Sequence, residues 1–90
     1  MVEVLIPPQL RRLCDGEEAV EVGPGTLGEV LLQLQERFNG VYDRLCQPDG
    51  RVRGSVLVLV NDEDIRFLRE LQTPVRSGDS VRLIPAFAGG

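Results

Sequence analysis

Histidine, lysine and tryptophan are absent from this 90-residue sequence, and it contains only two cysteines. Histidine is the side chain used most often for proton transfer at neutral pH and is the commonest metal ligand, so a Ser-His-Asp triad and a histidine-based zinc site are excluded. Cys14 and Cys46 are too few and too far apart in sequence to form a zinc knuckle. We therefore expect no enzymatic activity, no metal and no permanently bound cofactor. Reduced, structural thiols are expected for the two cysteines, with a disulfide between them as the alternative.

Long apolar segments and dense basic segments are also missing. The longest apolar run, residues 56–60, is far shorter than the ~20 residues that span a bilayer, and no charged-then-apolar leader opens the sequence. We therefore expect a cytoplasmic protein without a membrane partner. The formal net charge is -4 and the arginines are dispersed, so nucleic acid is not an expected partner. An acidic protein instead suits partners with basic docking surfaces.

The first quarter of the sequence predicts two strands. Residues 2–6 alternate in polarity, apart from Leu5, and end at Pro7-Pro8, which cannot donate to a strand ladder. Residues 18–22 alternate again, with Val20 and Val22 on one face. The two segments are predicted to form an antiparallel hairpin with a long loop.

A single amphipathic helix follows. Gly23-Pro24-Gly25 predicts a turn, and Thr26 with Glu29 three residues later is the pattern of a capping box. Asn39-Gly40 is suited to a left-handed helix end, which gives a helix of about thirteen residues, near the mean for globular proteins. One apolar stripe runs along it: Leu27, Val30, Leu31, Leu34 and Phe38.

Residues 23–28 also match the glycine pattern of dinucleotide-binding loops. Pro24 removes one backbone amide from that loop, and 90 residues are too few for a doubly wound sheet. A turn followed by a helix cap is the preferred interpretation.

The last third predicts a core strand and a final strand. Residues 55–60 are a continuous aliphatic run, typical of a central strand covered on both sides. After a turn at Asn61-Asp62, residues 65–71 predict a short strand or helical turn. Ser77-Gly78-Asp79 predicts another turn, and residues 80–84 a last strand that Pro85 ends.

This element order corresponds to an α+β protein with a β-grasp fold, in which a mixed sheet of four to five strands wraps around one main helix. A ferredoxin-like fold is disfavoured because only one segment carries a full helical stripe. In a β-grasp the first and last strands lie side by side in the sheet centre. We predict a single domain over residues 1–84 and a flexible C-terminal tail over residues 85–90.

The tail is the segment in which we expect chemistry. Two terminal glycines lack Cβ atoms, so the backbone is able to enter a narrow channel of a partner. A carboxylate at the tip is a poor electrophile, and its activation requires a leaving group such as AMP, which implies ATP in an activating partner. The adenylated carbon is then able to accept sulfur and become a nucleophilic thiocarboxylate. The tail residues are Pro85, Ala86, Phe87, Ala88, Gly89 and the terminal Gly90.

Three motifs resemble the MoaD and ThiS family of ubiquitin-like sulfur carriers. They are Val60-Asn61 after the core strand, Gly78-Asp79 before the last strand, and Pro85 followed by Ala88-Gly89-Gly90. Residues 60–67 and the Ala-x-Ala-Gly-Gly ending look most similar to the carrier that feeds sulfide to a cysteine synthase. The resemblance implies adenylation of Gly90 by an E1-like enzyme. It also implies handover to a sulfur-accepting enzyme, which is cysteine synthase-like or, alternatively, a molybdopterin or thiazole synthase.

Two other functions stay open at this point. A ubiquitin-like modifier joined to lysines of other proteins would share the adenylated intermediate, and a non-covalent β-grasp interaction module would not need the glycines. Phe87 suggests an anchor for a partner pocket, with folding back on the sheet as the alternative. An acidic cluster at a turn is usually solvated, and a partner-facing surface is its second interpretation. The residues of that possible partner surface are Asp62, Glu63, Asp64 and Arg66.

Overall fold

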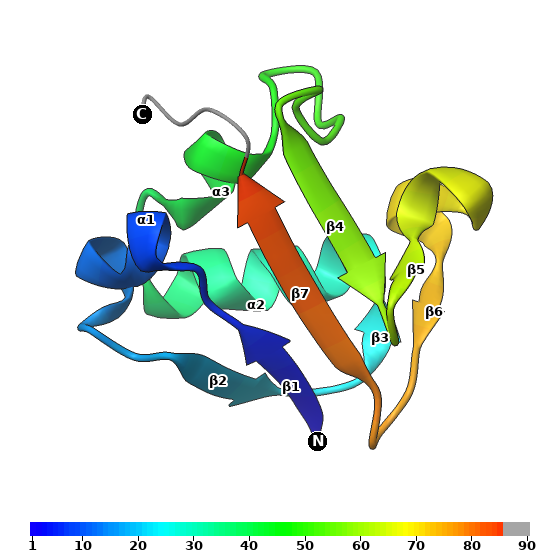
Figure 1. The fold of residues 1–90 in the computed structure, drawn as a ribbon, viewed down its shortest axis with the longest axis horizontal. Coiled ribbons are helices and arrows are strands. Elements are labelled where there is room, and N and C mark those ends of the chain that lie inside the picture. The colour runs from blue at the N-terminus through cyan, green and yellow to red at the C-terminus, as the bar shows by residue number, and fades with distance from the viewer. Residues whose placement is uncertain (86–90) are drawn as a thin grey trace.

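A computed structural model of the chain describes residues 1–85. Figure 1 shows that the strands form a sheet in front of the long helix, and that every predicted strand and the helix are present. The elements in chain order are β1 (Val2–Leu5), α1 (Pro8–Arg11), the 3-10 turn η1 (Arg12–Cys14), β2 (Ala19–Val22), β3 (Gly25–Thr26), α2 (Leu27–Arg37), α3 (Val41–Leu45), β4 (Val56–Val60), β5 (Glu63–Asp64), the 3-10 turns η2 (Ile65–Phe67) and η3 (Glu70–Gln72), β6 (Pro74–Val75) and β7 (Ser80–Pro85).

The main sheet has five strands in the order β2-β1-β7-β4-β5. The first and last strands are parallel neighbours in its centre, with Glu3 opposite Ser80 and Val4 opposite Val81. The other pairs, β1 with β2, β7 with β4 and β4 with β5, are antiparallel. The prediction of an α+β β-grasp fold, with a mixed sheet around one main helix, is therefore confirmed.

The long helix α2 begins where the capping box predicted. The backbone N–H of Glu29 donates to the Thr26 hydroxyl at 3.2 Å, and the Glu29 carboxylate accepts from the Thr26 N–H at 2.8 Å. The helix ends at Arg37, one residue earlier than predicted, because Phe38 is extended with φ -132°. Gly40 has the left-handed φ of 102° that was expected, but it precedes α3 rather than ending α2.

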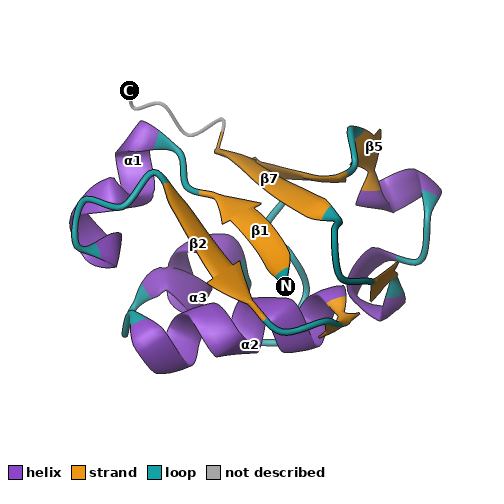
Figure 2. Cartoon of the chain, turned by 90° about the horizontal axis from the view of Figure 1, so that it is seen from below, coloured by secondary structure: helices purple, strands orange, loops and turns teal. Residues whose placement is uncertain are grey.

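The core lies between one face of the sheet and the helices α2 and α3. Figure 2, turned by 90°, shows both helices on the same side of the sheet, and no helix formed by residues 1–85 covers the central strands on the other side. The inward strand residues and the helix stripe are buried together in one cluster. We call the covered side of the sheet its inner face and the other side its outer face.

The prediction that the strand of residues 55–60 is covered on both sides is wrong. In β4, Val56, Val58 and Val60 are buried, whereas Leu57 and Leu59 are only partly buried. The reason is that the helices cover a single face, so alternate residues of β4 turn toward solvent. A continuous apolar run does not by itself reveal which of its residues the tertiary structure will cover.

Several short elements lie in segments that were predicted as loops. The segment between β1 and β2 contains α1, which begins with Pro8, and the 3-10 turn η1 after it. The strands β3 and β6 form a two-residue ladder in which Gly25 is opposite Val75. Such pairings join segments distant in sequence, so no local pattern announces them. For residues 65–71 a short strand or a helical turn was predicted, and the structure has the helical alternative, as the two 3-10 turns η2 and η3.

Candidate docking surface at the exit of the last strand

The chain leaves the described domain from a fixed point. Strand β7 is paired on one side with β1 and on the other with β4, and its last residue, Pro85, is buried opposite Val56. The strand is thus one residue longer than predicted, and Pro85 belongs to it. The other predicted tail residues lie outside the described residues, so their roles stay predictions: Ala86, Phe87, Ala88, Gly89 and the sulfur-carrying Gly90.

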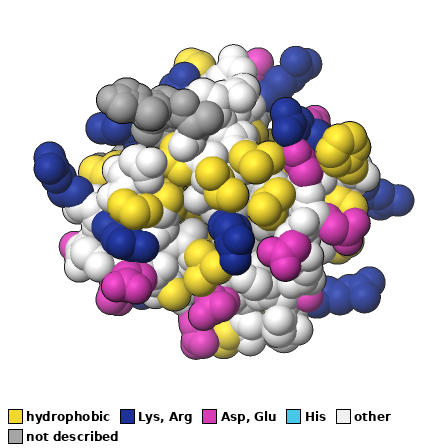
Figure 3. Space-filling view, viewed as in Figure 1, with side chains coloured by type: hydrophobic (Ala, Val, Ile, Leu, Met, Phe, Trp, Pro, Cys, Tyr) yellow, Lys and Arg dark blue, Asp and Glu magenta, His cyan; other side chains and the backbone are white. Residues whose placement is uncertain are grey.

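Apolar side chains occupy the outer face of the sheet beside this exit. Ile84 is opposite Leu57 in the ladder between β7 and β4, while Leu5 of β1 and Leu59 of β4 lie in the neighbouring row. Figure 3 shows hydrophobic side chains gathered in the middle of this face, with a basic side chain among them. Exposed clusters of this kind mark interaction sites on soluble proteins. We call Leu5, Leu57, Leu59 and Ile84 the outer patch.

One charged residue lies within the outer patch. Arg82 is exposed on β7 and is opposite Leu5 on one side and Leu59 on the other. Among residues 1–85, its guanidinium makes no ion pair and no hydrogen bond. The middle of the outer patch therefore presents a positive charge flanked by leucines.

An apolar groove of about 370 Å³ adjoins the outer patch at the exit of β7. Pro7 and Pro8 form one side and the end of β7, with Ile84 and Pro85, forms the other. Arg82 also lines this groove, so it lies between the outer patch and the point where the chain leaves the domain. The groove therefore adjoins Pro85, the last residue that the structure describes.

Of the four residues predicted as a possible partner surface, Asp64 and Arg66 are paired with each other. The Arg66 Nη2 is 2.6 Å from the Asp64 carboxylate, which also accepts the Arg66 backbone N–H at 2.8 Å. These hydrogen bonds lower the pKa of Asp64. Asp62 and Glu63 are exposed. The Asp64–Arg66 pair thus caps the start of the turn η2, whose last residue, Phe67, is 85% exposed.

Two of the motifs that carried the family resemblance meet at the other end of β7. Asn61 donates from its side chain to Asp79 at 3.0 Å and accepts the N–H of Ser80 at 3.0 Å. The Asp79 carboxylate also accepts the Arg76 N–H at 2.8 Å, and these bonds lower its pKa. Asn61 has a left-handed φ of 51°, which asparagine tolerates better than most residues. This cluster joins the end of β4 to the start of β7 and has a structural role.

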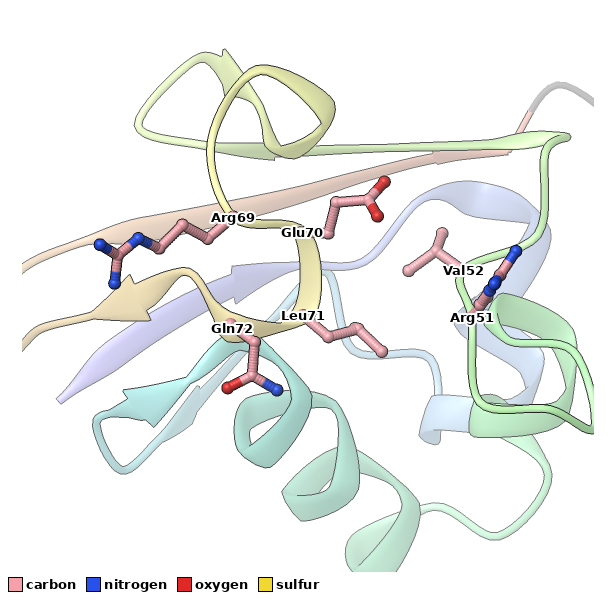
Figure 4. Close-up of a pocket in the computed structure, with 6 residues that line it drawn as sticks. All are labelled: Arg51, Val52, Arg69, Glu70, Leu71 and Gln72. Atoms are coloured by element: carbon pink, nitrogen blue, oxygen red, sulfur yellow. The ribbon is translucent and has the colours of Figure 1, made fainter.

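A wider cavity of about 560 Å³ lies away from the outer patch, between η3 and the loop before β4. Figure 4 shows Leu71 and Val52 pointing toward this space, whereas Arg69 points away from it. Glu70 adopts a left-handed φ of 50° here. The lining side chains do not converge on one point, so the cavity has no arrangement typical of a catalytic or ion-binding site.

Both cysteines are buried and free. Burial is the main cause that raises the pKa of the Cys14 and Cys46 thiols, which disfavours the reactive thiolate form. Among residues 1–85, no three His, Cys, Asp or Glu side chains are grouped to hold a metal ion, and no helix has the length and hydrophobicity to cross a membrane.

Sequence reasoning missed the outer patch. Its signal is present in the last strand, where Val81 and Leu83 are buried and strand alternation places Ile84 on the opposite face. In β4 the signal is the leucine at every outward position, which we interpreted as a second buried face. When a strand carries apolar residues on both faces and the fold has one main helix, the residues on the uncovered face are better interpreted as a docking surface.

The fold and this surface define a ubiquitin-like β-grasp domain whose last strand ends beside an apolar face. Residues 4–90 match the ThiS family, and the chain belongs to this family. It is 41% identical to the sulfur carrier protein CysO of Mycobacterium tuberculosis over 91 residues, which cover 99% of this chain and 98% of CysO.

Solved structures agree with the family assignment. The structure superposes with a TM-score of 0.93 on a chain of the Amycolatopsis orientalis BexX/CysO complex, at 37% identity and with all of both chains covered. It superposes on Mycobacterium tuberculosis CysO with a TM-score of 0.91, at 39% identity, covering 96% of this chain and 99% of CysO.

Proposed function

We propose that this protein is a sulfur carrier whose working group is the carboxylate of Gly90. The observation that supports this most directly is the full-length similarity to CysO, a sulfur carrier, combined with a last strand that pairs with β1 up to Arg82 and with β4 up to Pro85. A rigid exit beside an apolar surface suits a domain that serves as a handle for a reactive end. In this proposal the partner enzymes recognise the folded domain and react with its C-terminal carboxylate.

The proposed reaction has two steps on partner enzymes. An E1-like enzyme joins a Gly90 carboxylate oxygen to the α-phosphorus of ATP, and pyrophosphate leaves. A sulfide donor then attacks the carbonyl carbon, the bond to AMP breaks, and a thiocarboxylate remains. The described residues of this chain are proposed to contribute docking, with the outer patch and the groove at Pro7-Pro8 as the surfaces that bind the partner. Gly89 and Gly90, outside the described residues, are proposed to enter the partner's channel.

The sulfur acceptor is proposed to be a cysteine synthase-like enzyme, with a molybdopterin or thiazole synthase as the alternative. The similarity to CysO supports the first choice. The complex of a CysO chain with BexX supports the idea that a carrier of this shape docks as a folded domain on another protein. The thiocarboxylate sulfur displaces the leaving group of the acceptor's activated substrate. Hydrolysis of the resulting thioester then leaves the sulfur on the product as a thiol and returns the Gly90 carboxylate.

Intact mass spectrometry tests the proposal. The purified chain is incubated with an E1-like enzyme of its source organism, ATP and sulfide, and a mass gain of one oxygen-to-sulfur exchange is expected. Deletion of Gly90 is the matched control, since it leaves residues 1–85 untouched and should abolish the gain. A variant with one residue added after Gly90 that delivers sulfide normally, with the extension retained, would overturn the proposal.

Two further measurements with the wild-type chain and the Gly90 deletion distinguish the alternative functions. A ladder of lysine-linked conjugates in an extract, with no thiocarboxylate, supports a ubiquitin-like modifier. Binding to a partner that is unaffected by deletion of Gly90 supports a non-covalent interaction module.

A further inference from the structure

Arg82 is the one charged residue that the ladder places between Leu5 and Leu59, in the middle of the outer patch. Directly opposite side chains on adjacent strands have Cβ atoms about 5 Å apart, so both leucines lie beside its aliphatic stem. A partner that covers the patch also covers the guanidinium. Burial of an unpaired charge is strongly unfavourable, so such a partner must supply an acceptor.

The acids of this chain that lie near Arg82 are committed elsewhere or displaced along the strands. Asp64, which is opposite Leu59, is paired with Arg66 at 2.6 Å. Glu3 is opposite Ser80, two residues before Arg82 in β7. Among residues 1–85 the guanidinium of Arg82 is therefore left available for a group on another molecule.

We propose that Arg82 is a specificity-determining residue, and that the sulfur-accepting enzyme places a carboxylate against it within an otherwise apolar contact. The planar guanidinium matches a carboxylate with two parallel hydrogen bonds, which is a directional contact that leucines do not provide. This inference rests on the proposed function.

The acceptor is the partner chosen here for a chemical reason. Two terminal glycines have no side chains, so the end of the tail carries little information about which enzyme should receive the sulfur. Apart from Phe87, contacts that discriminate between acceptors are therefore expected from the folded domain, and specificity commonly uses a charge that is satisfied by the right partner and left unpaired by the wrong one. Arg82 also lines the groove beside Pro85, close to the point from which the chain continues toward Gly90.

Binding of the carrier to a recombinant cysteine synthase-like acceptor of the source organism tests this inference. Arg82→Glu should weaken binding by about thirtyfold or more, the effect expected when a buried interfacial pair is broken. Arg44→Glu is the matched control, because it makes the same charge change at an exposed residue of α3, on the inner side of the sheet. It should change the dissociation constant by less than about twofold, since a distant exposed charge is screened by salt.

Arg82→Leu distinguishes a carboxylate partner from a merely apolar one. The proposal expects weaker binding for this variant at both low and high salt, whereas equal or tighter binding would overturn it. Equal losses toward the E1-like enzyme and the acceptor would also overturn it, because the residue would then not select the acceptor. Melting temperatures of all variants are measured so that unfolding is not mistaken for lost binding.

The two proposals fail in distinguishable ways. A wild-type chain that gains no sulfur with the E1-like enzyme contradicts the proposed function. A wild-type chain that gains sulfur and binds the acceptor, but whose Arg82→Glu variant binds equally well, contradicts only the role of Arg82. A wild-type chain that binds none of the cysteine, molybdopterin and thiazole synthase acceptors contradicts both.

Discussion

The two faces of the sheet differ in what covers them rather than in how apolar they are. Neighbouring residues of β7 show this most directly: Leu83 on the inner face is 1% exposed, and Ile84 on the outer face is 38% exposed. The inner face stabilises the fold by removing apolar surface from water. The helices leave the outer face uncovered, so its leucines are only partly buried and contribute less to folding. Apolar content alone therefore does not separate core from interface.

The largest effect on stability is expected from the inner face. Leu83→Ala should lower the free energy of unfolding by about 3 kcal/mol, because it removes a buried side chain and leaves a cavity among packed neighbours. Urea denaturation followed by circular dichroism measures this. A loss below about 1 kcal/mol would mean that Leu83 is not a core residue and would break the comparison.

A smaller loss is expected where β4 meets β7. Asn61→Ala removes the two side-chain hydrogen bonds at 3.0 Å to Asp79 and Ser80, and should cost about 1–2 kcal/mol. Asn61→Gly is the control, because glycine accepts the left-handed backbone but also lacks the side chain. If Asn61→Gly were as stable as wild type, the hydrogen bonds would not matter. A register slip of one residue would exchange the inner and outer faces of a strand. The hydrogen bonds at this junction help to fix the register of β4 and β7, so the variant tests what keeps the two faces distinct.

A pH-dependent effect is expected at the same junction. Hydrogen bonds from the Arg76 N–H and from Asn61 lower the pKa of Asp79 in the folded state. Its contribution to stability is therefore complete above the unfolded carboxyl pKa of about 4, and is lost as the pH falls through the lower folded value. The difference in melting temperature between wild type and Asp79→Asn should be largest near neutral pH and shrink in acid. A difference that is constant from neutral pH to pH 2 would contradict this.

The smallest effect on stability is expected on the outer face. Ile84→Ala should lower the free energy of unfolding by less than about 1 kcal/mol, because Ile84 is partly exposed and leaves no enclosed cavity. Binding of the Ile84→Ala variant to the acceptor or to the E1-like enzyme should weaken, and surface plasmon resonance measures this. Together, Leu83→Ala and Ile84→Ala distinguish the contribution of a residue to folding from its contribution to docking at adjacent positions. A stability loss equal to that of Leu83→Ala would show that the outer face is also core.

Much of the fold was predictable because its signals are local. The capping box of Thr26 and Glu29 and the apolar stripe after it determine where α2 begins and which side it buries. The alternation in residues 2–6 and 80–84 identified the two strands that lie in the sheet centre. The terminal glycines, read with the Asn61 and Asp79 motifs, led to the correct family.

The candidate site was predicted less well, because it depends on which face of the sheet the helices leave open. The amino-acid sequence alone determined the strand and helix order, the buried stripe of α2 and the candidate reactive end at Gly90. The tertiary structure alone decided that Leu57 and Leu59 face outward, that Leu5 and Ile84 join them, and that Arg82 lies among them. The physical reason is that a side chain's period along a strand is local, whereas the layer that covers it comes from residues far away in the chain.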